Sequence, residues 1–318
     1  MQTVVILGAA GRIGDAAAKA FLAAGWRVRG VARNAKAATL RTGVEVIEAD
    51  AYDRQSLIGA VDGADVILNA LNPKYTEWET TVMPLAENVM AAAEASGALH
   101  LFPGNVYNFG YGIGLNTGEN APQIASTAKA RIRMEAEELF RRRSEERGVR
   151  TAILRGGDFY GGVKPESWLD LFILKDLKKH VFTWPGPSDV PHAFAYLPDF
   201  AEAFVALAEK RGSLAPFERF HFLGHTMTGL EMHKAAEAAT GRELRFKTMG
   251  WTMIRLAGLV VPIAREVAVM SYLWRTPHSL DGSKLERFAG KLRATSPAEA
   301  LRQSISDLGL DAPLKLAA

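Results

Sequence analysis

Val4-Val5-Ile6-Leu7-Gly8-Ala9-Ala10-Gly11-Arg12-Ile13-Gly14 is the stretch of this chain that decides its fold. The apolar start predicts a buried strand that stops at Gly8, and the alanine-rich run 16–22 predicts a helix. Glycines between a strand and a helix let the backbone approach a pyrophosphate, while the N–H groups of the helix start face the anion. Glycine spacing by itself also fits an ordinary loop, but its flanks favour a dinucleotide site. The expected contacts are Gly8, Ala10, Gly11, Arg12, Ile13 and Gly14.

The composition is that of an ordinary globular protein. The chain has 318 residues, of which 48% are hydrophobic and 23% charged, so it can bury a large core and carry an appended lobe. Its net charge of +3 is too small to indicate a nucleic-acid partner, and no RNP, zinc-finger or zipper pattern is present. The absence of cysteine excludes disulfides, thiolate metal sites and a thiol nucleophile.

The sequence also predicts a cytoplasmic protein with no membrane partner. The N-terminus runs directly into a strand, without the basic region or cleavage site of a secretory signal. The apolar segment 256–264 is interrupted by Pro262 and flanked by Arg255 and Arg265. A membrane-spanning helix needs about 20 apolar residues, so we expect this segment to form a packed pair of helices.

Strands and helices are predicted to alternate at short intervals after the first helix. The expected strands cover residues 25–32, 44–49, 64–70, 98–102 and 150–154, and the expected helices cover 35–40, 54–61, 80–96 and 126–147. Such alternation implies right-handed crossovers and therefore an α/β fold of the Rossmann type, with a doubly wound parallel sheet.

The regular alternation ends near residue 158. We expect residues 1–158 to form the dinucleotide-binding core, to which the chain returns at about 192–223. Residues 159–191 and 224–318 are then a smaller, mostly helical lobe on the substrate side. Ligands of open α/β sheets bind at the carboxyl ends of the strands, so the cleft should lie between core and lobe.

The residues at the strand ends favour NADP(H) as the cofactor. Arg33 ends the second strand, where a carboxylate commonly binds ribose hydroxyls and a cation binds a 2′-phosphate. A guanidinium suits a phosphate monoester, and we expect Arg12 to converge on the same spot, although loop arginines are usually surface residues. Asp50 should accept from the adenine amino group. The remaining expected cofactor contacts are Ala51, Ala70, Leu71, Lys129 and Gly157.

Several motifs together resemble the extended or atypical short-chain dehydrogenase/reductases, close to the NAD-dependent epimerase/dehydratase group. The glycine turn and Asp50 match, and the further matching segments are Asn69-Ala70, Asn88, Val106-Tyr107, Leu154-Arg155-Gly156-Gly157-Asp158-Phe159-Tyr160-Gly161 and Tyr196-Leu197-Pro198-Asp199-Phe200-Ala201. The resemblance covers roughly residues 1–225, and the tail 285–309 is similar to the family's small helical lobe. It implies the fold and a nicotinamide cofactor, and says much less about the reaction.

The catalytic pattern of that family is incomplete here. The family uses Y-x-x-x-K, in which the lysine lowers the pKa of the tyrosine and binds the nicotinamide ribose. Lys129 matches the lysine, but Ala125 stands in the tyrosine position and Pro103 in the position of the catalytic serine. The usual proton donor is therefore missing.

Two side chains could replace this donor, and two asparagines could assist. The run 129–135 resembles the K-x-x-x-R part of a motif in the isoflavone-reductase and NmrA-like branch, where a lysine acts without the tyrosine. A partly desolvated Lys129 could therefore act as an acid or base, or could only bind ribose. Tyr107 is a second candidate donor, unless it packs under its loop. Asn105 and Asn72 could polarise a carbonyl, although asparagine is also common in loops.

The expected substrate side is aromatic. Tyr160, Trp168, Phe172, Trp184, His192 and Phe194 could line it, and aromatic walls suit apolar ligands, although most of these side chains could equally form the core. We interpret His192 as a structural, hydrogen-bonded histidine that could also contact substrate. No residues have metal-ligand spacing, so no metal is expected, and no nucleophile-elbow motif is present.

The leading hypothesis is an NADP(H)-dependent oxidoreductase that reduces a carbonyl or activated double bond of a small, largely apolar or aromatic substrate. One alternative is a nucleotide-sugar epimerase or dehydratase, which needs diphosphate-binding cations such as Arg219, Arg265 and Arg275. The other is a non-catalytic NADP(H) sensor like the NmrA regulators. Helices 80–96 and 126–147 would form a homodimer face in relatives.

Overall fold

The computed structural model describes residues 1–33 and 39–310 and contains a parallel, doubly wound sheet, as the sequence predicted. In the described residues this sheet has seven strands in the order β10-β6-β5-β4-β1-β2-β3. The strands are β1 (Thr3–Leu7), β2 (Arg27–Ala32), β3 (Glu45–Glu48), β4 (Val66–Asn69), β5 (Leu99–Gly104), β6 (Thr151–Arg155) and β10 (Phe217–His221). All neighbours pair in parallel.

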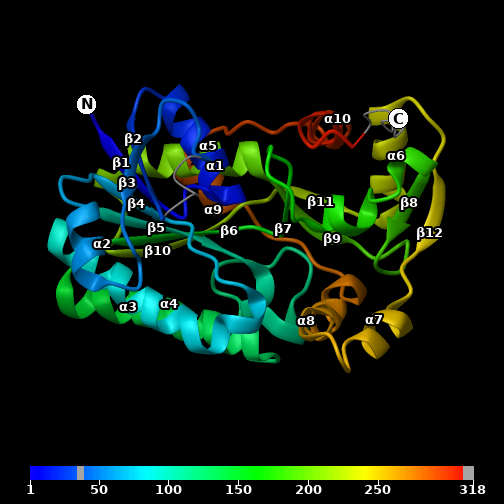
Figure 1. Ribbon diagram of the computed structural model, residues 1–318, viewed down its shortest axis with the longest axis horizontal. Helices are drawn as coiled ribbons and strands as arrows, with labels where there is room; N and C mark the ends of the chain where they lie inside the picture. The colour runs from blue at the N-terminus through cyan, green and yellow to red at the C-terminus, as the bar shows by residue number, and fades with distance from the viewer. Residues whose placement is uncertain (34–38, 311–318) are drawn as a thin grey trace.

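Helices cover both faces of the sheet (Figure 1). One face packs against α1 (Arg12–Ala23), α5 (Leu197–Glu209) and α9 (Ser283–Ala289). The other packs against α2 (Arg54–Ala60), α3 (Trp78–Ser96) and α4 (Ala128–Arg147). The apolar faces of these helices bury the strands almost completely, which fixes the register of the sheet and the places where its strands end. The helix expected at 35–40 lies largely outside the described residues.

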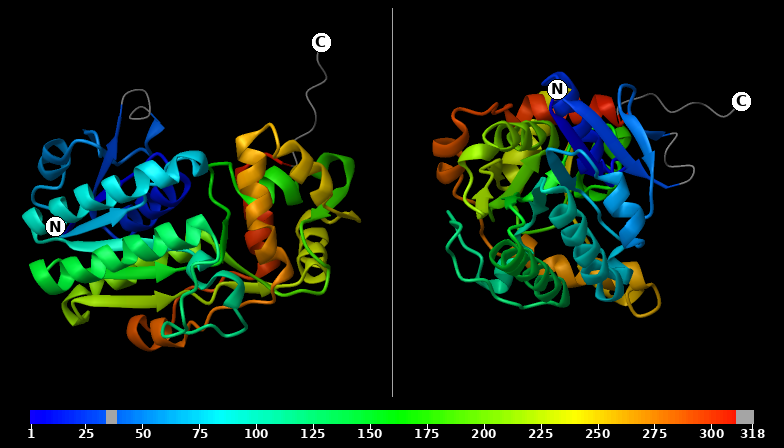
Figure 2. Two further views of the ribbon diagram at one scale, coloured as in Figure 1. Left: turned by 90° about the horizontal axis from the view of Figure 1, so that it is seen from below. Right: turned by 90° about the vertical axis from the view of Figure 1, so that its left-hand side faces the viewer.

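The lobe lies beyond the carboxyl ends of the strands (Figure 2). It contains two small sheets, β11-β9-β7 and β12-β8. Their strands are β7 (Asp158–Tyr160), β8 (Val181–Trp184), β9 (His192–Tyr196), β11 (His225–Met227) and β12 (Arg245–Thr248). Its α-helices are α6 (Gly229–Thr240), α7 (Trp251–Ala257), α8 (Pro262–Val269) and α10 (Pro297–Asp307). Short turns of other helical types are η2 (Tyr75–Glu77), η3 (Val106–Gly112), η4 (Leu169–Ile173), η5 (Leu177–Lys179), η6 (Arg211–Ser213) and η7 (Met270–Arg275).

Two expectations about the lobe are wrong. Residues 192–196, at the start of the expected return to the core, form β9, which pairs with β7 and β11 of the lobe and not with the main sheet. The rest of that stretch does return to the core, as α5 and β10. The segment 256–264 does form a pair of helices, but its apolar side chains are exposed rather than packed. Both errors have one cause: a short apolar run does not reveal which surface it contacts.

Candidate functional site

The glycine turn is tightly constrained by its neighbours. Gly8 has a φ of +77°, and a Cβ there would lie 2.8 Å from the carbonyl oxygen of Ala70, just past β4. A Cβ on Gly14 would lie 2.4 Å from the carbonyl oxygen of Gly8. Helix α1 follows with Gly11 as its N-cap, and no side chain caps it within the described part of the chain. The first N–H groups of α1 therefore have no side-chain acceptor, and this turn fits a dinucleotide phosphate.

The two arginines expected to select the cofactor point in different directions. Arg12 donates to the carbonyl oxygens of Phe159, at 3.0 Å, and Glu166, at 3.3 Å. Burial lowers the pKa of Arg12 from its ordinary value. Arg33 contacts both carboxylate oxygens of Asp50 at 3.3 Å and is exposed. The expected convergence is not seen, because lobe carbonyls lie within reach of Arg12.

The other expected cofactor residues lie at the ends of the strands, as their sequence positions require. The Ala51 carbonyl oxygen accepts from the side chain of Asn88 at 3.0 Å, which fixes the turn after β3. Leu71 donates its N–H to the side chain of Asn69 at 3.4 Å, next to Ala70. Gly157 is buried, and a Cβ there would lie 2.2 Å from a backbone oxygen of β9, so its lack of a side chain serves packing.

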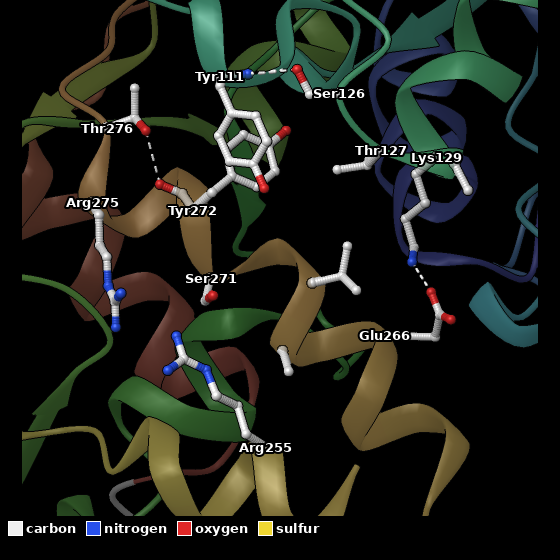
Figure 3. Close-up of a pocket in the computed structure, with 13 residues that line it drawn as sticks. Tyr111, Ser126, Thr127, Lys129, Arg255, Glu266, Ser271, Tyr272, Arg275 and Thr276 are labelled. Carbon is white, nitrogen blue, oxygen red and sulfur yellow. Dashed lines mark hydrogen bonds and ion pairs between the residues drawn. The ribbon is translucent and has the colours of Figure 1, made fainter. Parts of the chain in front are cut away.

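Lys129 lies in the first turn of α4, whose N-terminus is capped by Thr127 through the N–H of Ala130. Its side chain is only 4% exposed and forms an ion pair with Glu266 of α8 (Figure 3). Its Nζ atom also lies 5.0 Å from the centre of the Tyr75 ring. The core helix and the lobe therefore meet at the lysine that matches the family motif.

Tyr75, whose ring lies beside Lys129, belongs to a pair of hydrogen-bonded tyrosines. Tyr75 in η2 and Tyr107 in η3 share a hydrogen bond of 2.9 Å between their hydroxyl oxygens. Burial raises the pKa of Tyr75 and raises that of Tyr107 well above its ordinary value. Both hydroxyls are therefore protonated at neutral pH. Asn105 accepts the backbone N–H of Tyr107 at 3.1 Å, so its side chain holds the start of η3.

A cavity of about 660 Å³ opens beside Lys129. Its walls come from the loop before α4 and from the segment 255–276 of the lobe (Figure 3). The lining residues are Tyr111, Ser126, Thr127, Ala128, Lys129, Arg255, Glu266, Ala268, Val269, Ser271, Tyr272, Arg275 and Thr276. The cavity is large enough for a small organic substrate.

The residues expected to bind substrate do not line this cavity. Tyr160 and Trp168 belong to the aromatic core of the lobe, where the Tyr160 hydroxyl contacts Nδ1 of His225 at 2.7 Å. His192 is buried, contacts Asp158 through Nε2 at 2.8 Å and stacks on Trp274 at 4.0 Å. Their aromatic surfaces are used to build the lobe.

Asn72 and Arg133 lie at a second, much smaller cavity of about 20 Å³. Asn72 itself is exposed, while the Arg133 guanidinium packs over the rings of Trp78 and Phe102 at 4.6 and 5.1 Å. A space of this size holds a single water molecule and no organic substrate.

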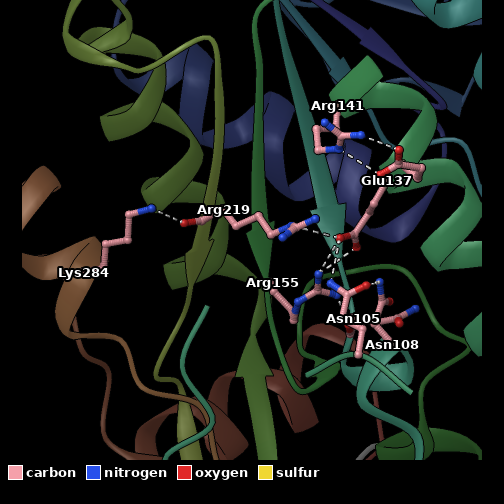
Figure 4. A network of polar contacts seen from close by, with 9 residues as sticks. Asn105, Asn108, Glu137, Arg141, Arg155, Arg219 and Lys284 are labelled. Carbon is pink, nitrogen blue, oxygen red and sulfur yellow. Dashed lines mark hydrogen bonds and ion pairs between the residues drawn. The ribbon is translucent and has the colours of Figure 1, made fainter. Parts of the chain in front are cut away.

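A buried ion pair anchors α4 and the η3 loop (Figure 4). Glu137 accepts from Arg155 of β6 at 2.7 and 2.8 Å, and both side chains are 1% exposed. Arg155 also donates to the backbone carbonyl of Asn105, and Arg219 of β10 lies 3.4 Å from Glu137. This network fixes the helix that carries Lys129 relative to the loop that carries Tyr107.

Sequence reasoning missed three residues of this region: Tyr75, Glu266 and Tyr272. Tyr75 lies in η2, a single helical turn after β4, and Glu266 and Tyr272 come from a part of the chain with no recognisable motif. The only available signal was an acidic residue, Glu266, within an otherwise basic and apolar stretch. That signal does not name a partner 137 residues away.

The family is decided by its sequence model. Residues 1–273 match the model of the NmrA-like family. The chain belongs to the NmrA-like family. A sequence comparison with curated proteins gives no match.

Solved structures show the same fold for this NmrA-like chain. A UDP-galactose 4-epimerase is similar with a TM-score of 0.74 at 17% identity, over 98% of this chain and 100% of that one. UDP-glucuronic acid 4-epimerase from Bacillus cereus, solved with UDP-glucuronic acid and NAD, has a TM-score of 0.76 at 16% identity, over 96% and 98%. The enzyme WbmH from Bordetella bronchiseptica, solved with NAD+, has 0.73 at 17%, over 96% and 98%. The predicted epimerase/dehydratase type of fold is therefore confirmed.

Proposed function

We propose that this NmrA-like chain is an NADP(H)-dependent oxidoreductase that reduces a carbonyl or activated double bond of a small, largely apolar or aromatic substrate. The observation that carries the proposal is the position of Lys129, which lines the 660 Å³ cavity and lies against Tyr75 of the tyrosine pair. The glycine turn supports a dinucleotide, and two similar structures are complexes with NAD.

The turn at Gly8–Gly14 would hold the pyrophosphate, and Arg33 would meet a 2′-phosphate. When bound, the dinucleotide supplies the hydride. Lys129 would bind the nicotinamide ribose, which requires its ammonium group to exchange Glu266 for ribose hydroxyls. The developing oxygen anion of the product would take a proton either from the Tyr107 hydroxyl, through Tyr75, or from Lys129.

Removing the proton donor should abolish most of the activity. NADPH oxidation is measured with a panel of aldehydes, ketones and enones for Lys129→Met, Tyr107→Phe and Tyr75→Phe. If Lys129 is the donor, Lys129→Met should lower kcat roughly 10²–10⁴-fold; if Tyr107 is the donor, Tyr107→Phe and Tyr75→Phe should do so. Lys291→Met is the control, because Lys291 is exposed on the surface. Tight NADPH binding without oxidation of NADPH by any substrate in the panel would contradict the proposal.

The preference for NADP(H) is tested at Arg33. Arg33→Gln should weaken NADPH binding about tenfold and leave NADH binding nearly unchanged, because only the 2′-phosphate needs the guanidinium. The dissociation constants are measured by fluorescence titration. Equal losses for both cofactors would mean that Arg33 acts through its contact with Asp50 instead.

A non-catalytic NADP(H) sensor is the second candidate. Two observations favour it. Ala125 and Pro103 stand where the family has its catalytic tyrosine and serine. The ammonium group of Lys129 is already engaged in an ion pair with Glu266. In that case Lys129→Met leaves every measurable activity unchanged and alters only cofactor affinity.

The nucleotide-sugar alternative has less support. Of its three expected cations, Arg219 lies near Glu137 and Arg265 donates to the carbonyl of Gly258, while Arg275 lines the cavity.

A further inference from the structure

The hairpin formed by α7 and α8, residues 251–269, carries an exposed apolar tip. It lies at the lower edge of the lobe, with the loop between the helices at the rim (Figure 1). The exposed fractions are 71% for Met253, 57% for Leu256, 76% for Leu259, 81% for Val260, 42% for Val261 and 51% for Ile263. Single exposed apolar residues are common, but six on one hairpin indicate an interaction surface.

The stretch of sequence that contains this hairpin carries mostly positive charge. Between residues 244 and 276 the chain has five basic residues, Arg245, Lys247, Arg255, Arg265 and Arg275, and one acidic residue, Glu266. All five basic residues are exposed, and Glu266 is engaged by Lys129. The segment thus carries a charge of +4, while the whole chain carries +3. The positive charge of the chain is therefore concentrated in the stretch of sequence that contains the hairpin.

We propose that the α7–α8 hairpin docks on the surface of an anionic lipid bilayer. The apolar tip would enter the boundary between headgroups and acyl chains, and the basic residues would contact lipid phosphates. This is surface binding: within residues 1–33 and 39–310, no helix is long and apolar enough to span a membrane. This proposal departs from the sequence-based expectation of no membrane partner.

A second copy of the chain is the competing occupant. A twofold contact through this hairpin would bring together two copies of the same positively charged surface. Like charges at a close contact repel, whereas an anionic headgroup layer is complementary to all of them. The charge pattern therefore favours the bilayer.

The hairpin is also part of the wall of the 660 Å³ cavity. Arg255 of α7 and Glu266 of α8 both line it. A bilayer bound at the tip would lie next to this cavity. A lipid-soluble molecule could then pass from the bilayer into the cavity. Bilayer binding itself does not depend on the proposed reaction and is tested without substrate.

The test is co-sedimentation of the full chain with vesicles of phosphatidylcholine, with and without phosphatidylglycerol. We expect binding to the anionic vesicles and little to the neutral ones. Leu256→Asp should weaken binding at least about tenfold, because it removes one buried apolar side chain and adds a negative charge. Leu115→Asp is the matched control, because Leu115 is also 57% exposed but lies in another loop. It should bind like the unchanged chain.

A second pair of variants tests the charge. Arg255→Gln and Lys247→Gln should each weaken vesicle binding roughly fivefold, with a smaller effect at high salt. Circular dichroism checks that the variants are folded. Failure of the unchanged chain to sediment with anionic vesicles would overturn the proposal. Vesicle binding by Leu256→Asp equal to that of the unchanged chain would also overturn it. If the unchanged chain self-associates without binding vesicles and Leu256→Asp does not self-associate, the hairpin is instead a contact between two copies.

Discussion

The two ends of the candidate site are built in different ways. At the end proposed to bind phosphate, the turn between β1 and α1 uses backbone atoms. Gly8 and Gly14 are required there because Ala70 and Gly8, respectively, leave no room for a Cβ. At the other end, Lys129, Tyr75, Tyr107 and Glu266 are side chains from four separate segments. A local backbone motif is readable from sequence, whereas a cluster of side chains depends on how distant segments pack.

The same contrast applies to the forces involved. The phosphate end depends on backbone conformation and on sterics within a few residues of chain. The other end depends on buried charge, because Arg155 pairs with Glu137 of α4 and also donates to the backbone carbonyl of Asn105, which fixes α4 relative to the η3 loop. We therefore expect single substitutions at the two ends to affect stability and dinucleotide binding to different extents.

The largest effect is expected at the buried ion pair. Glu137→Gln should lower the free energy of unfolding by about 3–5 kcal/mol, because it leaves the Arg155 guanidinium buried without a counter-charge. Glu138→Gln is the control on the next residue: that carboxylate is exposed and pairs with Arg141, so the expected loss is below about 1 kcal/mol. Urea denaturation measures both. Equal losses would mean that the buried pair is not what anchors α4.

A smaller loss is expected at the phosphate end. Gly14→Ala should cost about 3 kcal/mol and abolish most dinucleotide binding, because its Cβ would meet backbone atoms of Gly8 and Ala9. Gly59→Ala in α2 is the matched helical glycine with open space around it, and it should gain about 0.5–1 kcal/mol. Thermal denaturation and cofactor titration report on both variants. A stable Gly14→Ala protein that binds the cofactor normally would remove the steric argument.

The smallest effect concerns acid stability. Burial lowers the pKa of His100 to about 3, so the folded state stays neutral while the unfolded state takes up a proton below about pH 6.5. Stability therefore falls on acidification, by roughly 2 kcal/mol at pH 5 from this group. The pKa values of His221 and His278 are likewise lowered to about 3.

His100→Gln separates this contribution from the others. The variant should lose less stability than the unchanged chain between neutral pH and about pH 5, by roughly the amount that His100 contributes. Urea denaturation at both pH values gives the difference. The same loss in both proteins would show that His100 does not set the pH dependence.

The sequence by itself determined the parallel sheet, the position of the glycine turn and the place of Lys129 at the start of a helix. These follow from periods of two and 3.6 residues and from local backbone requirements, which a sequence displays directly. Arg12 shows the limit of this reasoning: its position in the turn was predicted, but its contacts with Phe159 and Glu166 were not.

Only the tertiary structure decided what surrounds Lys129. The pairing with Glu266, the Tyr75–Tyr107 bond and the separate sheet of β9 each join segments that no local pattern connects. The same is true of the α7–α8 hairpin: its apolar sequence predicted a packed pair of helices, but its apolar side chains are exposed. The sequence gives the chemistry of each side chain directly. The partners of that side chain depend on packing over the whole chain, because packing is a sum of many weak contacts between residues that are distant in sequence.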